Sequence, residues 1–106
     1  MKKYRQGDLM IQEIDSLPDN LIVSDTLLLI SGSSVSHDHK LTGGIIYPKE
    51  DGLLQGYFVL EKEEHAVHRT KNNEQGEHDD IILQKGVYAF YRQREYLPKG
   101  YSIIQD

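Results

Sequence analysis

Residues 45–61 read IIYPKEDGLLQGYFVLE and predict a β-hairpin. Two runs rich in β-branched and aromatic residues, Ile45–Tyr47 and Leu53–Glu61, flank the connection Pro48–Gly52. Proline fixes φ early in this connection and glycine accepts a positive φ at its end, which is the chemistry of a hairpin loop. The stretch therefore indicates two antiparallel strands.

The rest of the chain repeats this pattern of short apolar runs between turn residues, and no stretch shows a helical apolar stripe. Further strands are predicted at Gly7–Ile14, Leu21–Val23 and Thr26–Ile30, and a second pair at Ile81–Leu83 and Val87–Tyr96 around Gln84-Lys85-Gly86. The sequence predicts a single all-β domain over residues 1–106, either a small barrel or a sandwich of about eight short, mostly antiparallel strands. Residues 69–80 are almost entirely polar and are expected to form an exposed loop.

The composition excludes several classes of function. The chain has 106 residues, 12 Lys+Arg, 17 Asp+Glu, a formal net charge of −5 and no cysteine, so disulfides and thiolate metal sites are ruled out. We expect no nucleic-acid partner, because such binding depends on phosphate contacts from lysine and arginine. The longest apolar run, Leu27–Ile30, is far shorter than the roughly 20 residues that span a bilayer, so we expect no membrane partner and a cytoplasmic location.

The histidines are the strongest chemical signal. All five lie between positions 37 and 78, and His37 and His39 flank a single aspartate. On an extended segment these two rings share a face, so both can reach one metal ion. A third ligand is expected from His68 or His78. Imidazole ligands suit zinc, nickel, copper or iron, so the possible cofactor is one divalent transition metal.

Two other interpretations of the histidines remain open, namely exposed loop residues and a pH-responsive cluster. His65 is expected on the opposite strand face from His68 and is not taken as a ligand. Glu77, beside His78, is either a general base near a metal-bound water or part of an acidic loop. The chain has no cysteine nucleophile and no serine in a Gly-x-Ser-x-Gly elbow. Catalytic residues are therefore unassigned, and metal-dependent chemistry is the enzymatic route left open.

The pair His37 and His39, followed by a later histidine, partly resembles the cupins, which are small β-barrels that bind metal through such a pair, a glutamate and a further histidine. The glutamate of that pattern would fall near Thr42-Gly43-Gly44, where this chain has none.

A second resemblance extends over most of the chain, to a family of short uncharacterised proteins from bacteria and phages. It rests on the order of its blocks: Arg5-Gln6-Gly7-Asp8, Ser36-His37-Asp38-His39-Lys40-Leu41, Val67-His68, Glu77-His78-Asp79-Asp80, Gly86-Val87-Tyr88 and Arg92-Gln93-Arg94-Glu95-Tyr96. This resemblance implies a layout without an activity. It favours His37, His39, His68 and His78 as a set over His65.

Two functions follow as hypotheses. The first is a small metal-binding protein that uses His37, His39, His68 and His78, with enzymatic use open. The second is a metal-free interaction or assembly module, of phage or bacterial origin, in which edge strands or a tyrosine-rich face bind a protein partner or a second copy of the chain.

Overall fold

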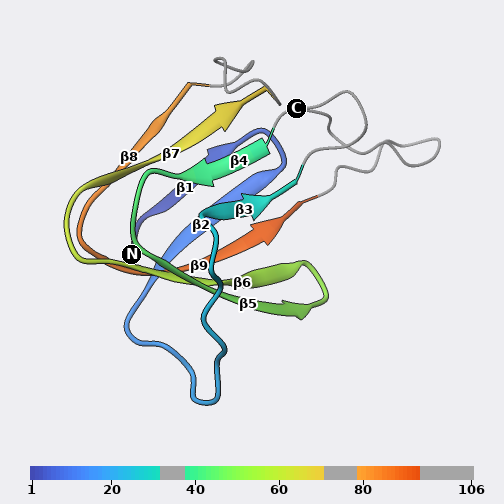
Figure 1. Cartoon of the computed structure of the whole chain (residues 1–106), viewed down its shortest axis with the longest axis vertical. Coiled ribbons are helices and arrows are strands. Elements are labelled where there is room, and N and C mark those ends of the chain that lie inside the picture. The colour runs from blue at the N-terminus through green and yellow to red at the C-terminus, as the bar shows by residue number, and fades with distance from the viewer. Residues whose placement is uncertain (32–37, 71–78, 94–106) are drawn as a thin grey trace.

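The computed structural model describes residues 1–31, 38–70 and 79–93, which form a sandwich of two β-sheets (Figure 1). The strands of these residues are β1 (Lys3–Gln6), β2 (Leu9–Ile14), β3 (Leu28–Ile30), β4 (Asp38–Leu41), β5 (Ile45–Asp51), β6 (Leu54–Leu60), β7 (Glu64–Arg69), β8 (Ile81–Leu83) and β9 (Gly86–Arg92). The predicted all-β class is confirmed. Of the two predicted architectures, the sandwich is the one observed, and the described strands form no closed barrel.

The two sheets differ in size and every pairing in them is antiparallel. The five-stranded sheet has the order β1-β2-β9-β6-β5 and the four-stranded sheet the order β3-β4-β7-β8. The chain changes sheet several times, so residues far apart in sequence meet between the sheets. The described residues include no helix long and apolar enough to cross a membrane.

The core lies between the inner faces of the two sheets. Phe58 on β6 stacks on Tyr88 on β9 with ring centroids 4.9 Å apart. Around this pair are fully or almost fully buried side chains from both sheets, namely Leu9, Ile11, Leu29, Ile30, Leu41, Ile46, Leu60, Ala66, Leu83 and Phe90. Burial of these apolar surfaces is the main force that holds the sheets together.

The predicted hairpin is present, but its turn is shorter than predicted. β5 continues through Pro48 to Asp51, and the turn is reduced to Gly52 and Leu53. Proline is tolerated there because β5 is an edge strand and its register shifts between Pro48 and Asp51.

The second predicted strand pair is not a hairpin. β8 pairs with β7 in the four-stranded sheet, whereas β9 pairs with β2 and β6 in the five-stranded sheet. The connection Gln84–Lys85 therefore leads the chain from one sheet to the other. The predicted strand at Leu21–Val23 is also absent, because these residues lie in the connection between β2 and β3.

The predicted polar loop lies only partly within the described residues. Arg69 ends β7, and Asp79 and Asp80 are exposed just before β8. The Arg69 guanidinium forms two hydrogen bonds to the Asp80 carboxylate, at 2.8 and 3.1 Å, and this interaction raises the pKa of Arg69. Residues 71–78 lie outside the described part of the chain.

Candidate functional site

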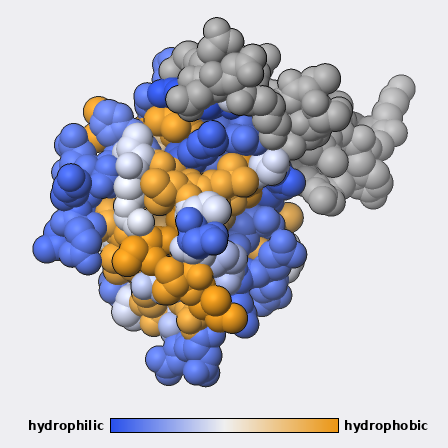
Figure 2. Space-filling view, viewed as in Figure 1, coloured by the Kyte–Doolittle hydropathy of each residue, from blue (hydrophilic) through white to orange (hydrophobic). Residues whose placement is uncertain are grey.

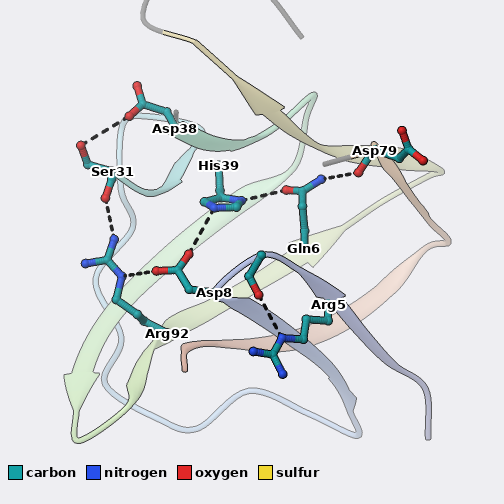
Figure 3. A network of polar contacts seen from close by, with 9 residues as sticks. Arg5, Gln6, Asp8, Ser31, Asp38, His39, Asp79 and Arg92 are labelled. Atoms are coloured by element: carbon teal, nitrogen blue, oxygen red, sulfur yellow. Dashed lines mark hydrogen bonds and ion pairs between the residues drawn. The ribbon is translucent and has the colours of Figure 1, made fainter. Parts of the chain in front are cut away.

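A network of polar side chains crosses the interior between the sheets (Figure 3). It begins in the turn between β1 and β2, where Gly7 adopts a φ of 61°. This tight turn places Gln6 at the end of β1 and Asp8 immediately before β2, and it brings both side chains close to β4 of the opposite sheet. Gln6 is only 2% exposed, so its polar atoms need partners within the protein.

The hydrogen bonds of Gln6 determine how its amide is oriented. Its Nε2 donates to the carbonyl oxygen of Ala66 at 3.0 Å and to that of Asp79 at 2.8 Å. Both amide protons are therefore used, and the Oε1 atom faces Nδ1 of His39 at 2.9 Å. Because an amide oxygen can only accept, Nδ1 of His39 is the donor in this contact.

The other ring nitrogen of His39 faces a carboxylate. His39 Nε2 lies 3.4 Å from Oδ1 of Asp8, and Oδ2 of Asp8 lies 3.2 Å from Nε of Arg92 on β9. The Arg92 guanidinium also donates to the backbone oxygen of Ser31. The network thus holds the β1–β2 turn, β9 and the β3–β4 region together.

His68 completes the centre of the site. It is the direct neighbour of His39 across β4 and β7, and the two rings stack with centroids 4.5 Å apart and planes 28° apart. His39 is 1% exposed and His68 is fully buried. Asp8 and Arg92 have side-chain exposures of 13% and 36%, so the network reaches solvent on their side.

The structure brings together two of the four histidines predicted as metal ligands, His39 and His68. His37 and His78 lie outside the described residues, as does Glu77. His65 pairs with Ile82 and is on the opposite face of β7 from His68, as predicted. Neither described histidine of the predicted set is an exposed loop residue.

Within residues 1–31, 38–70 and 79–93, no three His, Asp or Glu side chains are grouped so that they could by themselves hold a metal ion. The predicted histidine cluster is therefore seen only as a pair. Sequence reasoning missed Gln6, Asp8 and Arg92 as members of the site. The signal that could have found them was the pair of blocks around Gln6-Gly7-Asp8 and Arg92, which carry the family resemblance.

Comparison with known proteins gives a family. The model of the family described as "Domain of unknown function (DUF8820)" matches residues 5–93. The chain belongs to this family. No curated protein matches the chain, and no solved structure matches it. The match covers Gln6, Asp8, His39, His68 and Arg92, and it confirms the resemblance to an uncharacterised family. It gives no support to the cupin resemblance or to a phage origin.

Proposed function

We propose that this DUF8820 chain binds a divalent transition metal ion through His39 and Asp8. The observation that carries the proposal is the gap between Nε2 of His39 and Oδ1 of Asp8. The further ligands of this proposal come from the other histidines of the sequence prediction: His37 and His78, which lie outside the described residues, and His68, which stacks on His39 but does not form a three-ligand group with His39 and Asp8 in the described structure.

The first argument is the chemistry of the two facing atoms. Because Nδ1 of His39 donates to Gln6, the neutral ring has a lone pair on Nε2, and this lone pair faces a carboxylate oxygen. Two acceptors oppose each other only when a cation lies between them. That cation is either a proton on Nε2 or a metal ion.

The distance between Nε2 of His39 and Oδ1 of Asp8 also favours a metal ion. A charge-assisted N–H···O contact between an imidazolium and a carboxylate is usually about 2.7–2.9 Å long. The contact here is 3.4 Å. Two ligand atoms that bind one tetrahedral ion through bonds of about 2.0–2.1 Å are separated by about 3.4 Å. The spacing therefore fits a shared metal ion better than a shared proton.

Both ligand side chains are oriented by a second interaction within the protein. Metal-binding histidines usually donate their second ring N–H to an acceptor, and metal-binding carboxylates are themselves hydrogen-bonded. His39 donates to Gln6, whose amide is fixed by two backbone carbonyls, and the second oxygen of Asp8 forms an ion pair with Arg92. Both ligands are thus oriented before an ion arrives.

The test is the metal content of untagged protein, measured by inductively coupled plasma mass spectrometry before and after dialysis against a chelator. We expect about one equivalent of a transition metal, removed by the chelator and restored by zinc, nickel, iron or copper. Asp8→Asn keeps the shape of the side chain and is expected to weaken binding at least about tenfold.

The control variant is His65→Gln, on the outward face of β7, which should bind metal as the wild-type protein does. The proposal fails if the folded wild-type protein takes up no stoichiometric metal. It also fails if Asp8→Asn and His65→Gln bind metal with the same affinity as the wild-type protein.

A further inference from the structure

The outer face of the five-stranded sheet is apolar, although it is turned away from the core. Residues paired across strands share a face, so the register identifies its members. One row across the sheet is Ile45, Val59, Val87 and Ile14, and the next is Tyr47, Tyr57, Ala89 and Gln12. A third row contains Asp51, Leu54, Tyr91 and Met10. We call this set the outer apolar face.

An apolar outer face is unusual in a sandwich. Antiparallel sheets with one solvated side normally alternate apolar residues inward with polar residues outward. Here the inward residues of β6 and β9, such as Phe58 and Phe90, are apolar, and so are the outward residues Tyr57 and Val87 between them. A sheet that is apolar on both sides is typical of a surface covered by another molecule.

The outer apolar face carries charge only on its two edge strands. The chain has 17 Asp+Glu and a net charge of −5, yet the register puts a single carboxylate in these three rows, Asp51 on β5. The opposite margin carries the cations Lys3 and Arg5 on β1. Two copies of an acidic chain repel each other least when they meet on such a surface.

We propose that this face is the interface between two copies of the chain. Sheets pack face to face about 10 Å apart, and a two-fold axis makes both copies use the same surface. An axis parallel to the strands and midway between β6 and β9 places the row that contains Tyr57 of one copy over the same row of the other. Ala89 in that row is only 1% exposed, so the partly exposed Tyr57 side chains make the contact.

The size of the face suits a second copy. Five strands about 4.8 Å apart and three rows about 7 Å apart cover about 500 Å² in projection. Two such faces contribute about 1,000 Å² before side-chain relief is counted, which is the total area a specific interface needs.

Three of the four edge strands, β3, β5 and β8, are less suited to assembly than this face. β3 and β8 have three residues each, and on β5 the Ile46 carbonyl already accepts a hydrogen bond from Ser24 N while Pro48 has no N–H to donate. Short, covered or proline-containing edges resist pairing with another sheet. The inference is independent of the metal proposal, because no residue of the metal site lies on the outer apolar face.

The experiment is sedimentation equilibrium of the full chain over a range of concentrations. The wild-type protein is expected to weigh twice the 12.2 kDa of one chain. Tyr57→Arg should weaken the dimer at least about thirtyfold, since truncating an aromatic hot spot costs about 2 kcal/mol or more and about 1.4 kcal/mol is a factor of ten. Val87→Lys is the second interface variant and should act in the same direction.

The matched control is Ile82→Arg. Ile82 is 54% exposed on the outer face of the four-stranded sheet. Figure 2 shows orange, hydrophobic residues in the centre of one view of the molecule. Circular dichroism verifies that each variant is folded. The inference is overturned if Ile82→Arg disrupts the dimer while Tyr57→Arg and Val87→Lys leave it intact. It is also overturned if the wild-type protein remains monomeric at every concentration, whether or not it binds another protein or a lipid surface.

Discussion

Gln6 is the residue on which the geometry of the site most depends. Its amide uses both protons on backbone carbonyls and so presents its oxygen to His39. This side chain is uncharged and is not a metal ligand. Its role is to orient His39, so substituting it tests orientation separately from ligation.

We predict that Gln6→Met lowers the free energy of unfolding by at least about 2 kcal/mol, because buried polar partners lose their hydrogen bonds. Metal affinity should fall about 10–100-fold, as it does when outer partners of metal ligands are removed. Urea unfolding and metal titration measure the two effects. Gln84→Met, exposed in the connection between β8 and β9, is the control and should change neither. Unchanged metal affinity in folded Gln6→Met would contradict the role given to Gln6.

Tyr88 gives a prediction for alkaline pH. Its hydroxyl donates to the Gln84 carbonyl at 2.7 Å, and burial, followed by the nearby charges of Tyr4 and Glu13, raises the pKa of Tyr88. The folded protein therefore holds this proton more tightly than the unfolded chain does. The resulting stability is fully present below the ordinary tyrosine pKa of about 10 and is lost as the pH rises through the raised value.

We predict that Tyr88→Phe costs about 1 kcal/mol at neutral pH through the lost hydrogen bond. Between about pH 9 and 11 the variant should lose less stability than the wild-type protein. Urea unfolding at several pH values provides both numbers. If both proteins lose stability equally over this range, Tyr88 is not the group responsible.

At the residue scale, the sequence identified two of the five residues of the site, His39 and His68. His39 and His68 stood out because histidines are few and clustered, and the structure stacks their rings. Gln6 and Asp8 gave no comparable chemical signal, because their roles depend on a contact with a residue 33 positions from Gln6. A contact that distant is set by the path of the chain between sheets, which local pattern does not specify.

Two glycines in the β5–β6 hairpin are constrained in different ways. At Gly56, where φ is 153°, an added Cβ would lie 2.5 Å from the backbone oxygen of Tyr47. At Gly52, where φ is 61°, an added Cβ would meet nothing within 4 Å. Gly56 is therefore constrained by a close approach of two strands, and Gly52 only by its backbone conformation.

We predict that Gly56→Ala destabilises the protein by about 2–3 kcal/mol and Gly52→Ala by about 1 kcal/mol. Both variants lie in one hairpin, so each controls for the other in a thermal or urea unfolding experiment. Equal losses, or a larger loss for Gly52→Ala, would contradict the close contact between β5 and β6.

Element identity was easier to predict from sequence than element pairing. The strands at Ile45–Tyr47, Leu53–Glu61 and Ile81–Leu83 were located within a few residues, since alternating β-branched and aromatic residues are a local signal. The short connection before Gly86 suggested a hairpin, although β8 and β9 enter different sheets. Loop length alone does not distinguish a hairpin from a corner between sheets.

At the scale of the whole molecule, a bound metal ion should link the two sheets and so stabilise the folded state. Asp8 belongs to the β1–β2 turn of the five-stranded sheet and His39 to the four-stranded sheet. A ligand at 100 times its dissociation constant stabilises the folded state by about 2.7 kcal/mol, which raises the Tm of a small domain by about 10–20 °C.

We predict that added metal raises the Tm of the wild-type protein by about 10–20 °C and leaves the Tm of Asp8→Asn unchanged. Differential scanning calorimetry with and without metal measures both values. His65→Gln is the control and should show the full rise. The same rise in Asp8→Asn as in the wild-type protein would mean that metal binds elsewhere.

The outer apolar face shows why the sequence did not distinguish a barrel from a sandwich. The run Tyr57-Phe58-Val59-Leu60 is apolar at every position, so alternation does not reveal which residues face the core. A barrel wall and a sheet covered on both sides give the same pattern. Only the pairing of β9 with β2 and β6 assigns Phe58 inward and Tyr57 outward.

The protonation of the two ring nitrogens of His39 tests the metal site most directly, and it is observed by long-range ¹H–¹⁵N NMR of labelled protein with and without metal. The account predicts a proton on Nδ1, none on Nε2, and a shift of the Nε2 resonance when one equivalent of metal is added. A proton on Nε2 that persists after metal addition would contradict the account, because the cation between His39 and Asp8 would then be a proton.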